Sequence, residues 1–541
     1  MYIELFFIKL IYYKTNIFLR FRMTEEKRKI NRREYIKYVG AGIAGLAVGG
    51  AIGYFSRAPE VVKETIRETV TVGVSPTVTP TTVVTTVPKT VVTTVPTTIV
   101  STPAAKRIAF LNAETDADSI LALKMAMEAY MKEVNPSLSI ELSSIGWTDV
   151  WARLMLDIPA GRASEIADFP WNGPAATLAY RGLMEPVEDI IAKMDKIYGS
   201  SPEDWGNSFF EIEGHKYVVP FDTNGRTYLY LKNVFEEAKV DVPETWDELL
   251  EIAPQLQADL NKDGKIDRWA FAWPAGRTTA STTENIICLL WQCGSKVTDD
   301  DLNVVLDSPE YMDASIQALE YFKKLVDISP PGMETADWPE VITLYKTGKV
   351  ASAPYGGGRV IKEVWLADPK MEPNIRIAPK FPVVDKKRPI IYLPIDSWGI
   401  LKPSIFPEAG KEFLEWLATT DWYITFLHSV PIHFTPPNRK IVESKKFWEV
   451  VDTDPPKFKD LVELQNRHKE DLYAVLDTIF TGRDFVVEPG NKNPNPYTGD
   501  IMGALILPDM VQNYVLGRMS AKDAVRTAAD QLRSLIAKLK K

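Results

Sequence analysis

The sequence predicts an α/β fold with a mostly parallel sheet for residues 106–541. Two observations predict it. From residue 107 onward, short apolar runs alternate with segments of helical periodicity, which is the order expected when helices connect parallel strands. The chain has 541 residues, of which 45% are hydrophobic, and this is enough for a large core and for two or three domains.

The elements of this alternation follow one another in a regular order. Arg107–Leu111 is a short apolar run that fits a buried strand, and Ser119–Val134 has helical spacing. Leu138–Leu142 alternates as a second strand, Val150–Leu156 begins the next helix, and Ile166–Trp171 is a strand that ends in a loop. Because open sheets of this kind bind ligands at the carboxyl ends of their strands, the residues that follow these strands are the first candidates for a site.

An export signal precedes this part of the chain. Residues 23–57 carry the pair Arg32-Arg33 followed by an uncharged apolar stretch over residues 38–55, and they resemble a twin-arginine signal. The stretch is close to the lower length limit for a membrane-spanning helix. Basic residues precede it, so the positive-inside rule places the rest of the chain on the extracellular face. We favour an uncleaved transmembrane anchor over a cleaved signal, because no small-residue cleavage site stands before Arg57.

Two further N-terminal segments flank this signal. Residues 1–22 are apolar and aromatic and precede Met23, so we interpret them as a non-native extension; a second membrane segment is the alternative. Residues 58–105 are a linker rich in Thr, Pro and Val, in which the unit VVTTVP occurs twice. Regular prolines block a helix and disfavour a central strand, so the linker is expected to be an extended stalk. Its threonines either carry O-linked sugars or belong to an unmodified spacer.

Charge and cysteine content restrict the classes of function. The net charge of −9 argues against nucleic acid as the partner. The two cysteines, Cys288 and Cys293, are five residues apart and would lie on different faces of a helix, which predicts buried thiols rather than a disulfide. The four histidines form no pattern typical of a transition-metal site.

An ordered string of motifs lies near the middle of the chain. It reads GHKYVVPFDTNGRTYLYLKNVFEEAKVDVPETWDELLEIAPQL over residues 214–256. Thr245 and Glu248 have the spacing of a capping box, which predicts the start of a helix. The string resembles the crossover segment of the extracellular sugar-binding proteins of ABC importers, the maltodextrin-binding-like family. Further segments follow in the order of that family over nearly all of residues 107–541, and the anchor and stalk resemble its archaeal membrane-tethered members.

The resemblance implies a two-lobed, type II periplasmic-binding-protein-like fold with lobes joined by crossing hinge strands. One lobe would comprise residues 107–222 and 378–445, and the other residues 223–377 and 446–541. It implies that the lobes close on a sugar, expected to be a disaccharide or oligosaccharide, and deliver it to ABC permease subunits in the membrane. A monomeric binding domain without catalytic activity or a cofactor is expected.

The resemblance also implies residues that contact the solute. Sugars have apolar C–H faces and polar rims, so a sugar site combines flat aromatic surfaces with hydrogen-bonding side chains. The candidates lie in loops near strand ends or at the crossover, and they are Glu114, Trp171, Asn172, Asp222, Trp273, Tyr355, Gly356, Asp396 and Trp398. Packing in a core is the alternative role of each aromatic residue, and tethering of the hinge strands is the alternative for Asp222. Gly356 opens a run of three glycines, where the backbone can approach a ligand closely.

One loop has the spacing of a calcium site. Asp259, Asn261, Asp263 and Asp267 occupy positions 1, 3, 5 and 9, with glycine at position 6. Position 12 is Ala270, so the bidentate Glu is missing. Two interpretations stay open, a weak structural calcium site and a hydrated Asp-Gly turn.

Two other functions compete with solute binding. A membrane-anchored extracellular enzyme that degrades glycans would need two carboxylates that flank a cleft, and the many Asp and Glu residues do not exclude it. No nucleophile elbow, zinc motif or triad-like pattern supports this function. A sensor or adhesion ectodomain is the other alternative, because one fold serves many functions.

Overall fold

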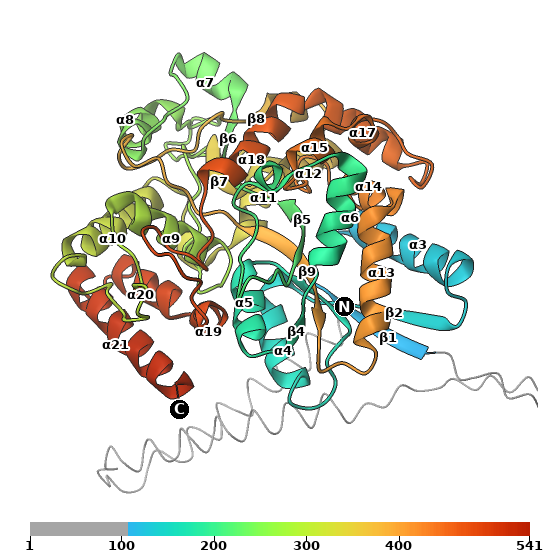
Figure 1. Ribbon diagram of the computed structural model, residues 1–541. Coiled ribbons are helices and arrows are strands. Elements are labelled where there is room, and N and C mark those ends of the chain that lie inside the picture. Colours follow the sequence, from blue (N-terminus) through green and yellow to red (C-terminus); the bar gives the residue numbers. More distant parts are fainter. Residues whose placement is uncertain (1–105, 541) are drawn as a thin grey trace, which may run out of the picture. The chain divides into compact units, whose positions relative to one another are not determined.

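The computed structural model describes residues 106–540, which are coloured along the sequence in Figure 1. The predicted extension (1–22), anchor (23–57) and stalk (58–105) lie outside the described residues. Within residues 106–540, no helix combines the length and the apolar character needed to cross a membrane.

The first sheet has six strands in the order β2-β1-β3-β9-β4, with β5 paired to β9. Its strands are β1 (Lys106–Asn112), β2 (Leu138–Ser144), β3 (Ile166–Phe169), β4 (Met184–Glu185), β5 (Val219–Thr223) and β9 (Ile395–Leu401). Strand β1 is parallel to β2 and β3, as the alternation predicted, whereas β9 is antiparallel to β3, β4 and β5. Because β9 comes from far along the chain, local periodicity gave no signal of its direction.

Six helices accompany this sheet and form the first lobe with it. They are α3 (Ala117–Glu133), α4 (Val150–Asp157), α5 (Asn172–Tyr180), α6 (Glu188–Tyr198), α13 (Pro407–Thr419) and α14 (Asp421–His428). Helix α3 begins where the Asp116 carboxylate accepts hydrogen bonds from the backbone N–H groups of Asp118 and Ser119. The predicted strands and helices of residues 107–171 are therefore confirmed, with shifts of a few residues at their ends.

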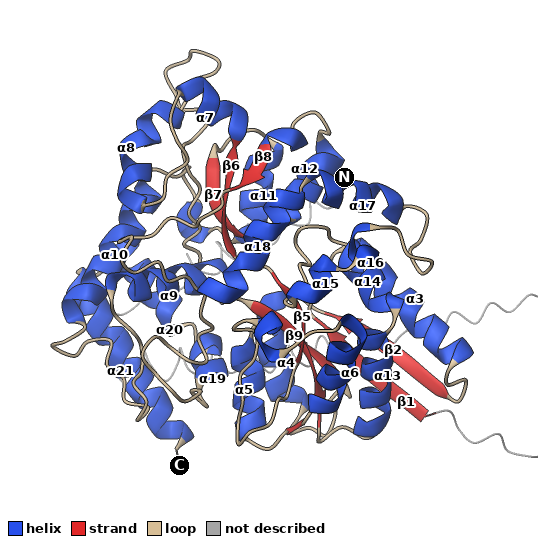
Figure 2. Ribbon diagram, turned by 45° about the horizontal axis from the view of Figure 1, so that its top comes forward, coloured by secondary structure: helices blue, strands red, loops and turns tan. Residues whose placement is uncertain are grey.

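The second lobe is built on a small sheet of three antiparallel strands in the order β7-β6-β8. Figure 2 shows the two sheets as separate groups of red strands. The strands are β6 (Arg226–Leu231), β7 (Ser352–Gly356) and β8 (Ile375–Ile377), and the helices are α7 (Lys232–Ala238), α8 (Trp246–Leu256), α9 (Ser281–Cys293), α10 (Met312–Asp327), α11 (Trp338–Lys346) and α12 (Arg359–Ala367). The predicted capping box at the start of α8 is confirmed, since Thr245 accepts from the Glu248 N–H and Glu248 accepts from the Thr245 N–H.

The C-terminal helices contact both lobes. They are α15 (Arg439–Glu443), α16 (Lys445–Trp448), α17 (Phe458–Arg467), α18 (Lys469–Thr481), α19 (Thr498–Gly503), α20 (Ile506–Val515) and α21 (Ala521–Leu539). Helices α20 and α21 lie beside α9 and α10, as Figure 1 shows, whereas α19 packs on α5. Helix α18 contacts β5 as well as β6 and β8, so it lies at the junction of the lobes.

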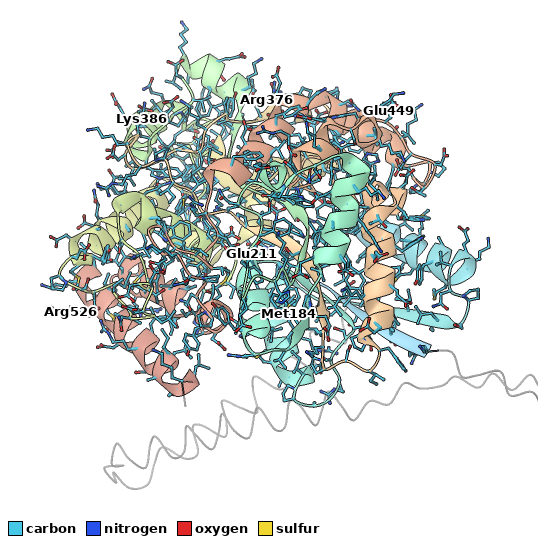
Figure 3. The ribbon with its side chains drawn as sticks, viewed as in Figure 1. Met184, Glu211, Arg376, Lys386, Glu449 and Arg526 are labelled. Atoms are coloured by element: carbon cyan, nitrogen blue, oxygen red, sulfur yellow. The ribbon has the colours of Figure 1, made fainter. Side chains whose placement is uncertain are left out.

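Side chains fill the space between these elements (Figure 3). Met184 on β4 is buried, whereas Lys386, Glu449 and Arg526 are exposed at the edges of the molecule. Both cysteines are free and buried, as predicted, and burial raises the pKa of the Cys288 thiol to about 11. A buried thiol with so high a pKa is unreactive at neutral pH.

Candidate functional site

A cavity lies between the two lobes. It contains about 550 Å³ of space free of protein atoms, counted out to its open mouth. The lining residues are Trp147, Pro170, Trp171, Asn224, Arg226, Ala280, Ser281, Glu284, Trp338, Pro354, Tyr355, Gly356, Arg359 and His433. They come from the ends of strands and the starts of helices in both lobes, which is where ligands of α/β sheets bind.

Aromatic side chains from both lobes face this cavity. Trp147 follows β2 and Trp171 directly precedes α5, both in the first lobe. In the second lobe, Tyr355 lies on β7, and Trp338 is the first residue of α11, which Asp337 caps through a capping box. Trp171 and Tyr355 are buried, whereas Trp147 and Trp338 are half-buried. The cavity therefore has flat apolar surfaces on both sides.

Glu284 on α9 joins the two lobes inside the cavity. Its Oε1 accepts a hydrogen bond from Trp171 Nε1 at 2.9 Å, and its Oε2 pairs with Arg226 Nη1 at 2.8 Å. Burial raises the pKa of Glu284, and the positive charge of Arg226 opposes that rise. The carboxylate and the guanidinium thus neutralise each other where the cavity is enclosed.

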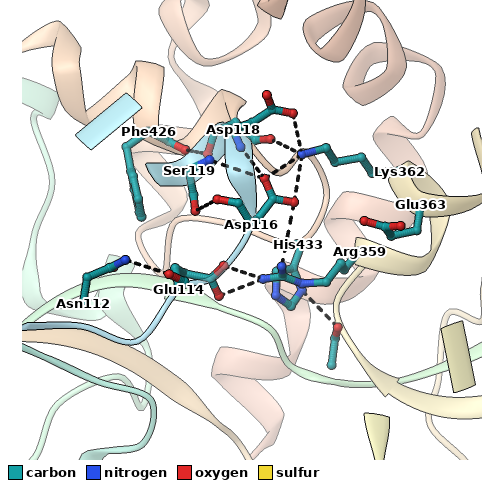
Figure 4. Close-up of polar contacts among 12 residues, drawn as sticks. Asn112, Glu114, Asp116, Asp118, Ser119, Arg359, Lys362, Glu363, Phe426 and His433 are labelled. Carbon is teal, nitrogen blue, oxygen red and sulfur yellow. Dashed lines mark hydrogen bonds and ion pairs between the residues drawn. The ribbon is translucent and has the colours of Figure 1, made fainter. Parts of the chain in front are cut away.

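An ion pair also joins the two lobes, and Figure 4 shows it. Arg359 at the start of α12 donates from Nη2 to both carboxylate oxygens of Glu114, at 2.7 and 2.9 Å. One turn further along, Lys362 Nζ lies 2.9 Å from both Asp116 and Asp118, which flank the start of α3. Burial raises the pKa of Glu114, although Arg359 opposes the rise. These contacts tie the loop after β1 to α12.

Further carboxyl groups lie buried on the strands of the first lobe. We call Asp168 on β3, Asp222 on β5 and Asp396 on β9 the carboxyl layer; all three are fully buried. Asn224, which lines the cavity, donates from Nδ2 to Asp396 Oδ2 at 2.7 Å. Burial, with the charges of neighbouring carboxylates, holds the pKa of each of the three well above its usual range.

The structure brings three of the nine predicted solute-contacting residues into the cavity wall, and these are Trp171, Tyr355 and Gly356. Glu114 is bound to Arg359 instead. Asn172 is buried at the start of α5, where its Nδ2 donates to the Ser208 carbonyl at 3.1 Å. The other two predicted acids, Asp222 and Asp396, belong to the carboxyl layer.

Two predicted aromatic contacts are corrected by the structure. Trp273 is fully buried in the second lobe, where it stacks on Phe271 with ring centroids 5.6 Å apart. Trp398 is fully buried on β9 and stacks on Phe221 at 4.4 Å. Both rings pack in the apolar interior, which was the alternative role for each aromatic residue.

The glycine run after β7 also has a different role from the predicted one. A Cβ on Gly358 would lie 2.4 Å from Ile432 Cγ2, and a Cβ on Gly357 would lie 3.0 Å from His433 Nδ1. The Gly356 carbonyl contacts His433 Nδ1 at 3.1 Å. These glycines therefore let the second lobe pack closely on the segment after α14, and only Gly356 also lines the cavity.

The predicted calcium loop closes on its own backbone. Asp259 accepts from the N–H groups of Asp263 and Gly264, and Asp267 accepts from those of Leu260 and Asn261. Over residues 106–540, no three His, Cys, Asp or Glu side chains gather in a way that could hold a metal ion. These hydrogen bonds are those of an Asp-Gly turn, and the calcium site stays a prediction beside it.

Sequence reasoning missed most of the cavity wall. Glu284 was missed because it is one of several polar residues in the first turns of α9, and nothing local shows that this turn is buried against the cavity. Trp147 lies in the loop after β2 but was not singled out, and Trp338 begins a helix rather than following a strand. The N-cap pattern Asp337-Trp338-Pro339-Glu340 is a signal that would have placed Trp338 at an exposed helix start.

The model of one protein family matches residues 116–424, which is more than half of the chain. Its description is bacterial extracellular solute-binding protein. The chain belongs to this family. Among the curated relatives of this solute-binding protein is a protein of Brucella abortus (strain 2308) named as a binding protein, 23% identical over 353 residues, which cover 63% of this chain and 77% of the relative. The family resemblance predicted from the sequence is confirmed.

Solved structures of similar shape support the same fold. An ABC transporter solute-binding protein of Thermotoga lettingae TMO, bound to α-D-tagatose, has a TM-score of 0.60 at 19% identity and covers 80% of this chain and 99% of its own. The maltose/maltodextrin-binding domain MalE of Bdellovibrio bacteriovorus, bound to maltotriose, has a TM-score of 0.58 at 18% identity and covers 80% of this chain and all of its own. The two-lobed α/β fold of this solute-binding protein is therefore the fold of those proteins.

Proposed function

We propose that this protein is the extracellular sugar-binding subunit of an ABC importer, and that the solute binds in the cavity between the lobes. The observation that carries the proposal is the pair of aromatic walls, with Trp147 and Trp171 from one lobe and Trp338 and Tyr355 from the other. Such surfaces suit the C–H faces of a sugar ring. Membership of the solute-binding family and the sugar ligands of the compared structures support the same choice.

The charges around the cavity favour a neutral sugar over an ionic solute. Arg226 is paired with Glu284, and Arg359 is paired with Glu114. A solute of either sign would have to break one of these buried pairs, which leaves a charge without its partner. Neutral hydroxyl groups can instead add hydrogen bonds to the carboxylate oxygens and to the amide of Asn224 without separating the pairs.

The cavity leaves little free space between its walls. About 70 Å³ of it can hold the centre of a water-sized molecule. Small-molecule sites occupy about 300–1,000 Å³, so a sugar would enter only after the lobes move apart.

The wider assignments follow from the same proposal. We place the lobes at residues 107–222 with 378–445 and 223–377 with 446–541, joined by hinge strands that close on the solute. The closed form would dock on permease subunits, and residues 23–57 and 58–105 would serve as anchor and stalk on the extracellular face. The binding domain would be monomeric. A glycan-degrading enzyme is not favoured, because Glu284 is the one carboxylate among the described residues that line this cavity, and glycosidases use two.

Thermal unfolding of the full-length protein tests the proposal. The panel contains neutral monosaccharides and oligosaccharides, tagatose and maltotriose among them, and charged sugars as the comparison. A ligand at 100 times its Kd adds about 2.7 kcal/mol to the free energy of unfolding and raises the midpoint clearly. We expect a rise with one or more neutral sugars and an unchanged sugar after the experiment. A rise with charged sugars only contradicts the neutral assignment, and cleavage of a sugar contradicts the binding role.

A further inference from the structure

Two carboxyl groups face each other where the chain leaves the first lobe. Asp222 on β5 and Asp396 on β9 are register partners in the antiparallel pair of these strands, so their side chains emerge side by side. Both are fully buried. Only Thr223, Asn224 and Gly225 separate Asp222 from β6, the first strand of the second lobe. The pair therefore lies at the start of the segment that connects the first lobe to the second.

The groups around the pair supply few hydrogen-bond donors. Neither carboxylate oxygen of Asp222 has a hydrogen-bond donor among the described residues. The Asp396 carboxyl lies within hydrogen-bonding reach of the Asp222 carboxyl, but when both are ionised neither can donate. Asp396 accepts one hydrogen bond, from Asn224 Nδ2 at 2.7 Å, while its Oδ1 has no partner. The Asn224 amide oxygen, buried next to the pair, has no donor either. This site thus has an excess of acceptors and lacks a hydrogen.

The surrounding charges also disfavour the ionised form of both carboxyl groups. Glu114 and Asp168 are the other acids that act on both members of the pair. Arg359 is the cation that acts on Asp222, and Glu114 already binds its guanidinium. Two nearby phenols do not supply the missing donor: Tyr423 on α14 donates to the Phe221 carbonyl at 2.7 Å, and the Tyr392 hydroxyl is buried without a partner. Two adjacent, fully ionised carboxylates would repel each other here without compensation.

We propose that Asp222 and Asp396 form a proton-binding site, in which one shared proton makes an O–H···O hydrogen bond that clamps β5 to β9 at the lobe crossing. With the proton, one carboxyl donates to the other, and the pair carries a single negative charge that Asn224 helps to solvate. Without it, the two strands carry like charges in direct opposition. The inference concerns the hinge and stands whether or not the solute is a sugar.

The site makes stability depend on pH in a defined direction. In the unfolded chain both carboxyls are ionised above about pH 4. The folded protein keeps one proton to higher pH, because burial and neighbouring carboxylates hold the pKa of both groups well above the usual range. The folded state then binds one proton more than the unfolded state, so stability falls as pH rises through this window. One excess proton changes the unfolding constant tenfold per pH unit.

Urea unfolding of the full-length protein between pH 5 and pH 8 tests the clamp in four forms: the wild type, D222N, D396N and D222N/D396N. In each single variant the Asn side chain donates an N–H hydrogen bond to the remaining carboxylate and replaces the shared proton. We therefore expect the pH dependence of the unfolding free energy to fall by the amount that corresponds to one bound proton. The double variant is expected to lose no more than either single variant, because the pair holds one proton. Unchanged slopes in the single variants, or a double variant that loses two protons, would overturn the proposal.

A second measurement does not depend on stability. A protonated carboxyl group has an infrared carbonyl band distinct from that of an ionised carboxylate. At pH 7 the difference spectrum between the wild type and D396N should show the loss of one protonated band and its shift in D₂O. Asp157→Asn is the control: burial opposes ionisation of Asp157, but its pairs with Arg153 and Arg162 outweigh burial and lower its pKa. D157N should therefore lose no protonated band, and a D396N spectrum that likewise shows no such loss contradicts a shared proton.

Discussion

The cavity wall and the carboxyl layer are connected through Asn224, yet they compensate buried charge in different ways. Around the cavity, the buried carboxylates have guanidinium partners: Glu284 in the wall pairs with Arg226, and Glu114 behind the wall pairs with Arg359. In the carboxyl layer, Asp168, Asp222 and Asp396 have no cationic partner within ion-pair distance among residues 106–540, and their pKa values are raised further. The comparison teaches that the buried ion pairs gather around the cavity, whereas the carboxyl groups with the strongly raised pKa values lie among the strands.

Among the changes that test this comparison, removal of Arg359 is expected to lower the free energy of unfolding the most. R359M leaves Glu114 buried without its partner, and breaking a buried ion pair in this way costs about 3–5 kcal/mol of stability. Urea unfolding of R359M against the wild type measures the loss. The double variant E114Q/R359M removes both charges and should recover a large part of the stability.

The matched control for R359M is K346A, which breaks the partly exposed pair of Lys346 and Glu363 on α11 and α12. Such pairs contribute about 0–1 kcal/mol. If R359M and K346A lose equal stability, the surroundings of the cavity do not depend on this buried ion pair, and the contrast with the carboxyl layer fails.

Sequence patterns identified the first lobe much better than the second. Residues 107–171 alternate apolar strands and amphipathic helices, and each predicted element is present. The second sheet has three short antiparallel strands drawn from residues 226–377, with long insertions between them, so no local period reveals their pairing. The capping box at Thr245 was predictable because its hydrogen bonds join residues three apart.

The site was less predictable because a tryptophan looks the same in sequence whether it packs or binds. Trp171 and Trp398 both stand near strand ends beside polar residues, yet one faces the cavity and the other stacks on Phe221. Which face of a strand points inward depends on pairing with distant strands. The same limit applies to Glu114, whose ion pair with Arg359 joins residues 245 positions apart.

Removal of an aromatic wall is expected to weaken solute binding without a comparable loss of stability. Trp338 is half-buried at the start of α11, and the Arg359 guanidinium lies 5.9 Å from the centre of its ring. Truncation of a tryptophan that anchors a ligand costs about 2 kcal/mol, so W338A should bind the best sugar of the panel about 30-fold more weakly. Titration calorimetry measures this change.

The comparison for W338A is W273A, which removes a ring from the core of the second lobe. Large-to-small changes of this kind cost about 3–5 kcal/mol of stability. W273A should therefore unfold at lower temperature, whereas folded W338A keeps its midpoint within a few degrees. Equal affinity of W338A and the wild type for every sugar would place the solute elsewhere.

The smallest expected effect concerns a carboxyl group that resembles the carboxyl layer but lies apart from it. Burial raises the pKa of Asp484 to about 7. Its Oδ1 accepts from the Val486 N–H at 2.8 Å, and its buried Oδ2 has no partner. Because the folded pKa is above the unfolded value, the stability from this proton is complete below about pH 4 and is lost as pH rises through about 7.

D484N should remove this dependence, which amounts to at most about 1.4 kcal/mol per pH unit between about pH 4 and pH 7. Urea unfolding of D484N and D222N in parallel separates the pH dependence that comes from Asp484 from the pH dependence that comes from the Asp222–Asp396 pair. Since Asp484 faces no second carboxyl, its proton is held by burial alone, and the effects of D484N and D222N on the slope should add. Effects that do not add would mean that the two acids titrate as one system, and the distinction between a clamped pair and a solitary buried carboxyl would have to be abandoned.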